Sequence, residues 1–210
     1  EIVKRHEALR TRFVMVEGGP VQVIEPVLEL AIELRDLSAM PGSEREVEAQ
    51  RLARAEAALP FDLTSGPLLG AKLLRLAEEE HVALFTMHHI ISDGWSMGVL
   101  IEELATLYEA FSRQLPSPLP ELPVQYADFA TSQREWLQGE VLAEQLSYWR
   151  EQLSGVPAVL ELPTDHVRPA VKRYRGARER LELNAELSAA LKAMSQEQGV
   201  ALFMVLLAAF

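Results

Sequence analysis

The sequence predicts a mixed α/β fold in which helices pack against a mixed sheet. Apolar residues recur at helical spacing along much of the chain, most clearly from Trp95 to Phe111. Short apolar runs lie between these stretches. The run from His81 to His89 (HVALFTMHH) is apolar on both faces apart from Thr86 and the histidines, as is typical of a central strand. With 210 residues, the chain is long enough to bury a core in one or two domains.

The first sixty residues are expected to form a helix, a hairpin and a second helix. Ile2 to Leu9 has helical spacing. Thr11 to Ile24 contains two β-branched runs around a Gly-Gly-Pro turn, which predicts a hairpin. Ser43 and Glu46 form a capping-box pattern ahead of an Ala- and Leu-rich stretch, which predicts a mostly solvated helix.

The centre of the chain is expected to supply the heart of the sheet. Leu68 to Leu76 and His81 to His89 are two apolar runs joined by a short acidic turn, so we expect them to pair. A helix from Trp95 to Phe111 should follow. Three acidic residues are expected on the face opposite its apolar stripe: Glu102, Glu103 and Glu109.

Proline then interrupts the regular pattern. Leu115 to Pro123 contains four prolines and predicts an extended surface crossover. Two helices should follow, at Tyr126 to Leu137 and Val141 to Leu153. Leu160 to Ala170 is too rich in proline for a regular element.

We place a boundary near residue 170, with one lobe at 1–170 and the beginning of a second at 171–210. Arg178 to Leu183 alternates like a strand, and a helix from Ala185 to Gln198 should stop at Gly199. The last eleven residues, Val200 to Phe210, indicate a buried core helix whose apolar face lacks a partner. The chain is therefore expected to be a segment of a larger polypeptide.

The composition of the chain disfavours several classes of partner and of chemistry. Twenty Lys and Arg against 31 Asp and Glu give a net charge of -11, which disfavours nucleic acid as a partner. The longest uncharged apolar run, eleven residues, is about half of what a membrane span needs, so we expect no membrane partner. The absence of cysteine excludes disulfides and thiolate chemistry. It leaves the compartment open, with the cytoplasm as the default expectation.

The most informative stretch is Met87 to Met97, MHHIISDGWSM. On a strand, His88 and His89 would point to opposite faces. Asp93 and Gly94 fall in the turn before the next helix, where an Asp can satisfy backbone donors or an arginine. One histidine at the end of a buried strand could therefore act as a general base.

Three other interpretations of these histidines are open. The commonest is a histidine that is simply hydrogen-bonded in the core. A metal site would need converging ligands, but adjacent strand histidines diverge, and no second cluster has ligand spacing. A Ser-His-Asp hydrolase would need a G-x-S-x-G elbow, which the sequence lacks. Ser92 and Ser96 are more simply turn and N-cap residues.

Four motifs resemble those of the condensation domains of nonribosomal peptide synthetases, in the chloramphenicol-acetyltransferase-like superfamily. HHIISDG at His88 to Gly94 resembles HHxxxDG, and RHEALRTRF at Arg5 to Phe13 resembles RHExLRTxF. YADFA at Tyr126 to Ala130 resembles YxDFAxW, and PTDHVRP at Pro163 to Pro169 resembles PxDxxRP. Together they span residues 5–169.

One departure concerns packing. Ser132 stands where the YxDFAxW pattern usually has Trp, so the packing of that indole is either missing or supplied by Trp136.

The resemblance implies a fold, an activity and partners. The fold is a two-lobed α+β two-layer sandwich with the active site between the lobes, and this chain would hold mainly the N-terminal lobe. The activity is amide-bond formation between a donor acyl or peptidyl thioester and an acceptor aminoacyl thioester. Phosphopantetheine arms of donor and acceptor carrier domains would hold both, beside an adjacent adenylation domain. No directly bound cofactor or metal is implied.

The resemblance also implies residue roles. His89 occupies the catalytic position, removing a proton from the amine or fixing its orientation, while His88 is expected to be structural. Asp93 is expected to pair with Arg5 or Arg10 and hold the turn. Gly94 would let the substrate approach the backbone closely.

Two other functions stay open at this point. One is a coenzyme A-dependent acyltransferase of the same superfamily, and the other is a non-catalytic docking platform for carrier proteins. The two histidines argue against a heterocyclisation domain, and Trp95-Ser96 after the glycine favours the type that joins two L-residues. We expect the 210-residue segment alone to be inactive.

Overall fold

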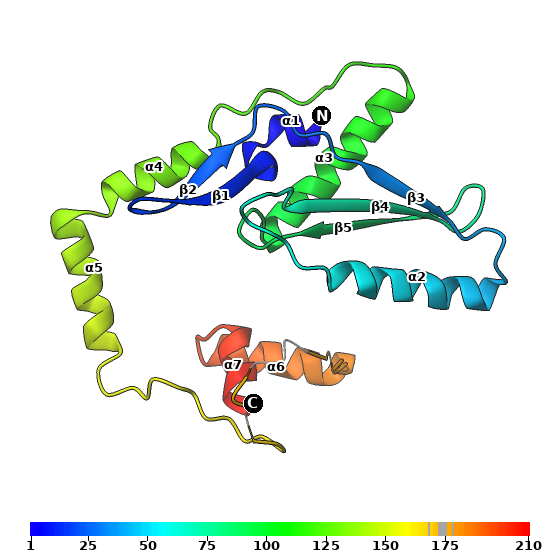
Figure 1. Cartoon of the computed structure of the whole chain (residues 1–210). Coiled ribbons are helices and arrows are strands. Elements are labelled where there is room, and N and C mark those ends of the chain that lie inside the picture. Colours follow the sequence, from blue (N-terminus) through cyan, green and yellow to red (C-terminus); the bar gives the residue numbers. More distant parts are fainter. Residues whose placement is uncertain (168, 172–175, 178) are drawn as a thin grey trace. The chain divides into compact units, whose positions relative to one another are not determined.

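The computed structural model describes residues 1–167, 169–171, 176–177 and 179–210. The chain divides into two compact units, Glu1–Ser154 and Gly155–Phe210 (Figure 1). The break falls where Gly155 adopts a positive φ of 77° after a helix end, so the predicted lobe boundary near residue 170 lies inside the second unit. The assignment of lobes to 1–170 and 171–210 stays a prediction.

The first unit begins with a short helix, a 3-10 turn and a hairpin. Helix α1 (Ile2–Arg5) and turn η1 (Glu7–Arg10) replace the single helix that was predicted, because His6 between them is extended, at φ -102° and ψ 105°. Strands β1 (Thr11–Val16) and β2 (Gly19–Ile24) pair antiparallel, as predicted. The backbone at the hairpin turn is left-handed, with φ 103° at Gly18.

Three strands form the larger sheet, in the order β3-β4-β5. Strand β3 (Ile32–Asp36) runs parallel to β4 (Leu69–Arg75), which pairs antiparallel with β5 (His81–Met87). The pairing of β4 with β5 was predicted, whereas β3 was not. The central position predicted for β5 is wrong within the described residues, because β4 is the middle strand. Its side chains supply much of the core: Leu69, Ala71 and Leu74.

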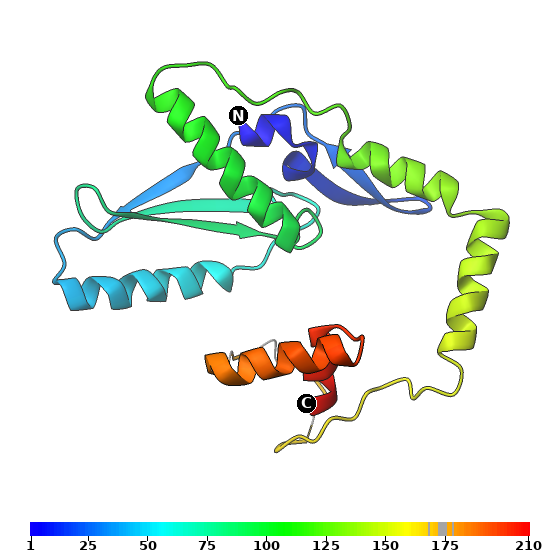
Figure 2. The same ribbon diagram turned by 180° about the vertical axis from the view of Figure 1, so that it is seen from behind.

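Two helices flank this sheet. Helix α2 (Gly42–Ala57) lies beside β5, and helix α3 (Gly94–Ser112) passes in front of the strands in the view of Figure 2. Both helices were predicted, and α2 is mostly exposed, as expected. The capping box at Ser43 and Glu46 is wrong, however. The helix begins two residues earlier, at Gly42 after an N-cap at Pro41, so Ser43 lies inside the first turn.

The segment between α3 and α4 contains no helix or strand, as its prolines predict. Helices α4 (Tyr126–Trp136) and α5 (Gly139–Gln152) complete the first unit, close to their predicted bounds. Trp136 is 62% exposed, so it does not supply the core packing that a replacement indole would provide.

The second unit contains helices α6 (Ala185–Glu197) and α7 (Leu202–Ala209). As predicted, α6 stops before Gly199, whose φ is 63°. Residues 179–183 form no strand, and Arg178 lies outside the described residues, as does Arg168 of the PTDHVRP motif. A strand needs a hydrogen-bonding partner, and alternation of apolar residues does not supply one.

Helix α7 is not the buried core helix that was predicted. Val205 is buried, but the large apolar residues around it are exposed: Phe203, Met204, Leu206 and Leu207. Helix α7 packs on α6 around Val205, and most of its apolar surface is exposed within the described residues. None of the described helices combines the length and the apolar character needed to cross a bilayer.

Candidate active site

A pocket of about 340 Å³ lies in the first unit, between the start of the chain, the loop after β5 and the beginning of α3. Its apolar lining comes from residues including Ile2, Leu9, Met87, Ile91, Val99 and Leu100. Its polar lining comes from His6, His89, Ser92, Asp93 and Ser96. The loop that carries HHIISDG therefore forms one wall of the pocket, and the segment that carries RHEALRTRF forms another.

The two adjacent histidines have different surroundings. His89 lies in the turn after β5, is exposed and lines the pocket. His88 is half-buried and does not line it. Its backbone N–H donates to the Leu68 carbonyl at 2.9 Å, and its Nδ1 accepts the backbone N–H of Ile90 at 3.0 Å. Its ring also meets Phe61 edge-on, with centroids 6.0 Å apart. His88 thus braces the loop, while His89 is available to a ligand.

The predicted separation of the two histidines is observed, but strand alternation does not cause it. Strand β5 ends at Met87, so both histidines lie beyond the last ladder residue. The turn from His89 to Ile91 sets their directions instead.

Asp93 is the N-cap of α3. Its carboxylate accepts the backbone N–H of Ser96 at 2.8 Å and the Ser96 hydroxyl at 2.7 Å. Hydrogen bonds from the Ser96 backbone and side chain, with a smaller contribution from the charge of nearby His89, hold the pKa of Asp93 below its usual value. The carboxylate therefore satisfies backbone donors, one of the two roles that the sequence allowed.

The predicted ion pair between Asp93 and Arg5 or Arg10 is wrong. Arg5 pairs with Glu103, and Arg10 pairs with Glu7 at 3.2 Å. Arg10 also donates to the Glu25 carbonyl at 2.5 Å, which ties η1 to the end of β2. The first turn of a helix has backbone N–H groups without a partner in the helix. In α3 these groups are only a few positions from Asp93 in the sequence, so they bind its carboxylate in place of an arginine.

Gly94 is the first residue of α3. A Cβ atom built there would meet no heavy atom within 4 Å, so the structure leaves open space on this side of the backbone. The role of Gly94 in substrate approach stays a prediction.

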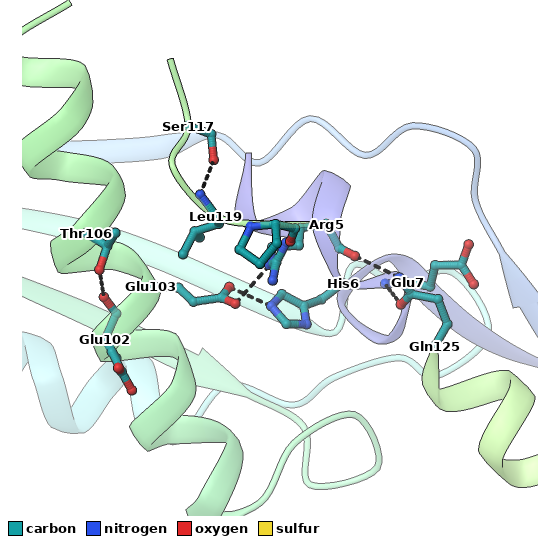
Figure 3. Close-up of polar contacts among 10 residues, drawn as sticks. Arg5, His6, Glu7, Glu102, Glu103, Thr106, Ser117, Leu119 and Gln125 are labelled. Carbon is teal, nitrogen blue, oxygen red and sulfur yellow. Dashed lines mark hydrogen bonds and ion pairs between the residues drawn. The ribbon is translucent and has the colours of Figure 1, made fainter. Parts of the chain in front are cut away.

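Glu103 forms the buried polar centre beside the pocket, together with Arg5 and His6 (the Glu103 cluster; Figure 3). The side chain of Glu103 is 10% exposed. It accepts from Arg5 Nε at 2.8 Å and from His6 Nε2 at 2.6 Å. Burial opposes its ionisation, but the hydrogen bonds from His6 and Arg5 outweigh burial and hold the pKa of Glu103 below its usual value. Arg5 also donates to the carbonyl of Pro120.

The position expected for Glu103, opposite the apolar stripe of its helix, is wrong. Val99, Glu103 and Leu107 are spaced four residues apart, so Glu103 lies on the inward face of α3. That spacing could have predicted a buried position for Glu103. The cationic RHEALR segment could have predicted its partner.

Gln125 is a second residue that the sequence analysis missed. Its Oε1 accepts the backbone N–H of Glu7 at 3.1 Å, and its Nε2 donates to the carbonyl of Arg5 at 3.0 Å. Gln125 is also the N-cap of α4. It therefore fixes the α1–η1 segment against the start of α4, next to Tyr126, which lines the pocket.

The pocket offers polar chemistry in mostly apolar surroundings. Within the described residues, no three side chains of His, Cys, Asp or Glu are grouped to hold a metal ion. An imidazole such as that of His89 can accept a proton or hold an amine through a hydrogen bond. The apolar walls can bury the rest of a small acyl or aminoacyl group.

Comparison with known proteins agrees with the motifs. The family model of the condensation domain matches residues 1–210. One of the linear gramicidin synthase proteins of Brevibacillus parabrevis is 56% identical over 209 residues, which cover 100% of this chain and 4% of the synthase protein. The chain thus spans a small part of the length of this curated relative.

Solved structures show the same architecture. The X-domain from teicoplanin biosynthesis superposes with a TM-score of 0.83 at 29% identity, covering 95% of this chain and 44% of that one. The starter condensation domain of rhizomide synthetase gives a TM-score of 0.66 at 22% identity, covering 75% and 37%, and bears on the fold alone. The predicted chloramphenicol-acetyltransferase-like fold class is confirmed. With residues of three of its four motifs lining one pocket and its whole length matched by the family model, this chain belongs to the condensation-domain family.

Proposed function

We propose that this chain forms peptide bonds in nonribosomal peptide synthesis. The α-amino nitrogen of an acceptor aminoacyl thioester attacks the carbonyl carbon of a donor acyl or peptidyl thioester. The new C–N bond forms and the donor C–S bond breaks. The thiolate leaves on the donor's phosphopantetheine arm, and the nitrogen loses one proton. Both reactants enter as substrates tethered to partner domains.

The location of His89 is the observation that supports this proposal most directly. Of the two motif histidines, only His89 lines the pocket, while His88 is held by Leu68, Ile90 and Phe61. His89 takes the proton of the attacking amine or fixes the direction of its lone pair. A positioned base contributes about 10²–10⁴-fold, whereas bringing two reactants together contributes roughly 7–11 kcal/mol. Positioning is therefore the larger part of the proposed mechanism.

The proposed partners follow from the chemistry. Donor and acceptor carrier domains deliver the thioesters on phosphopantetheine arms, and an adjacent adenylation domain supplies the acceptor amino acid. The chain itself needs no bound cofactor for this step. The similarity to a linear gramicidin synthase protein supports a place in an assembly line of this kind. The proposed compartment is the cytoplasm, and the cysteine-free sequence does not require an oxidising one.

The proposal is tested with the full-length protein and two carrier domains. One carrier is preloaded with a donor aminoacyl thioester and the other with an acceptor, and mass spectrometry of the intact carriers follows the product. We expect a dipeptidyl group to accumulate on the acceptor carrier, and to be absent when His89 is replaced by alanine.

Two other outcomes would assign the alternatives. Transfer from free acyl-coenzyme A to a free amine, with no reaction between loaded carriers, would identify a coenzyme A-dependent acyltransferase. Carrier binding without product, and without any effect of His89→Ala, would identify a docking platform. Either result would contradict the proposed peptide-bond formation.

A further inference from the structure

A second imidazole, that of His6, lines the same pocket as His89. It comes from the RHEALRTRF segment, where His6 is the single extended residue between α1 and η1. The side chain of His6 is 25% exposed. It is more exposed than the side chain of Glu103 and is accessible from the pocket. The proposed mechanism above gives this ring no role.

The Glu103 cluster sets the tautomer of His6. A carboxylate can only accept hydrogen bonds, and hydrogen bonding keeps Glu103 ionised over the physiological range by lowering its pKa. His6 Nε2, 2.6 Å from Glu103 Oε2, must therefore carry the hydrogen. In Figure 3 the ring is directed at this carboxylate.

Arg5 balances the charge of the Glu103 carboxylate that His6 also contacts. Its Nε lies 2.8 Å from Glu103 Oε1, so a permanent cation already balances the carboxylate. The other charged or titratable groups of the pocket wall are His89, Asp93 and Tyr126, and Asp93 is occupied by Ser96. The Nε2–H group alone therefore satisfies the hydrogen bond to Glu103, which leaves Nδ1 as the ring nitrogen that can accept a hydrogen bond.

We propose that His6 is a second substrate-contacting residue of this pocket, whose Nδ1 accepts a hydrogen bond from the α-amino group of the acceptor substrate. Glu103 is its positioning residue. This inference rests on the proposed function, in which the attacking group is an amine and the group attacked, a thioester carbonyl, offers only acceptor atoms. Of these two reacting groups, only the amine can donate a hydrogen bond to His6 Nδ1.

The decisive variant is His6→Gln in the full-length protein. The Gln side-chain nitrogen can still donate to Glu103, but the variant has no nitrogen at the position of Nδ1. We expect unchanged thermal stability, a KM for the acceptor carrier raised about 3- to 10-fold, as fits the loss of one hydrogen bond, and an unchanged KM for the donor carrier. His81→Gln, at the exposed start of β5, is the matched control. It should change neither the thermal stability nor the KM for either carrier. Wild-type kinetics in His6→Gln would overturn the proposal.

Nuclear magnetic resonance of ¹⁵N-histidine-labelled full-length protein separates this proposal from the proposed function. The probe is aminopantetheine carrying glycine in amide linkage, which presents a free amine and cannot react as a thioester. We expect it to shift the His6 Nδ1 resonance even if no turnover is found. Active protein with an unshifted His6 would overturn the role of His6 alone.

The same spectra test Glu103 as the positioning residue. In the wild type, His6 should give the resonances of a single neutral tautomer protonated at Nε2. In Glu103→Gln the amide can donate as well as accept, so a mixture of tautomers should replace it. An unchanged tautomer would overturn the role of Glu103.

Discussion

Asp93 and Ser96 cap helix α3 reciprocally. The Asp93 carboxylate accepts the Ser96 backbone N–H at 2.8 Å, and the Ser96 hydroxyl accepts the Asp93 backbone N–H at 3.2 Å. The acidic residue of HHIISDG therefore fixes where the loop of His89 ends and the helix begins. It acts through backbone geometry and not through an ion pair with a distant arginine.

This capping role predicts how substitutions at Asp93 behave. Asp93→Ala should lower the melting temperature, because the first turn of α3 loses its side-chain acceptor. Asp93→Asn should recover most of the loss, since asparagine caps helices as well as aspartate does. Thermal melts monitored by circular dichroism compare the three proteins. If Asp93→Asn were as unstable as Asp93→Ala, a charge interaction would outweigh the cap.

His88 and His89 should respond oppositely to truncation. In the full-length protein, His89→Ala should keep the wild-type melting temperature and lose about 10²–10⁴ in condensation rate. His88→Ala should mainly lose stability, because the Ile90 N–H and the Phe61 ring lose their partner. Single-turnover assays with preloaded carriers, run beside melts, measure both properties. A stable but inactive His88→Ala together with an active His89→Ala would reverse the assignment.

Glu103 should contribute to the acid sensitivity of the fold. Its folded-state pKa lies below its ordinary value of 4.5, so its stabilisation is complete above about pH 4.5 and is lost as the pH falls through the folded-state value. Glu103→Gln should cost up to about 3–5 kcal/mol at neutral pH, the range for a buried pair that loses one partner. Its stability should then change less between pH 5 and pH 3 than that of the wild type.

Glu109→Gln is the matched control for that measurement. Glu109 lies on the same helix and pairs with Arg113 at 3.0 Å, but both side chains are about two-thirds exposed. Its replacement should cost less than about 1 kcal/mol. Urea titrations at several pH values provide the comparison, and equal losses in the two variants would contradict the special role of Glu103.

Two glycines should respond to alanine in opposite directions. At Gly70 in β4, a Cβ atom would lie 2.7 Å from Thr86 Oγ1 and 3.2 Å from Glu56 Oε1. Gly70→Ala should therefore cost about 1–3 kcal/mol. At exposed Gly98 in α3 nothing lies within 4 Å, so Gly98→Ala should gain about 0.5–1 kcal/mol through helix propensity. Chemical denaturation of both variants tests the pair.

The spacing of apolar residues predicted the elements that have an apolar pattern of their own. The hairpin from Thr11 to Ile24, strand β4 and helix α3 all form where their patterns predict them, although α3 buries Glu103 and leaves Tyr108 of its apolar stripe exposed. Strand β3 was missed because its sequence, IELRD, contains three charged residues, and every one of its residues is exposed. The ladder with β4 holds it in place, and such a partner cannot be seen in a five-residue window.

The candidate site could be predicted in part. The HHIISDG motif predicted a functional role for His89, and His89 lines the pocket. The partner of Arg5 could not be deduced, because it depends on which of several acidic groups comes within reach after folding, whereas the binding of backbone donors by Asp93 was one of the two roles that the sequence allowed. Glu103 is separated from Arg5 by 98 positions, whereas Ser96 is three positions from Asp93.

The contact between Gln125 and Glu7 spans 118 positions and has a consequence for synthesis on the ribosome. At about 5–20 residues per second, on the order of ten seconds separate the emergence of these two residues. The hairpin β1–β2 can form meanwhile from local contacts, but the chain's first turns cannot take their final hydrogen bonds. Ile2 and Leu9 stay uncovered during that interval. The wall of the pocket that contains His6 is thus completed only after the start of α4 has been synthesised.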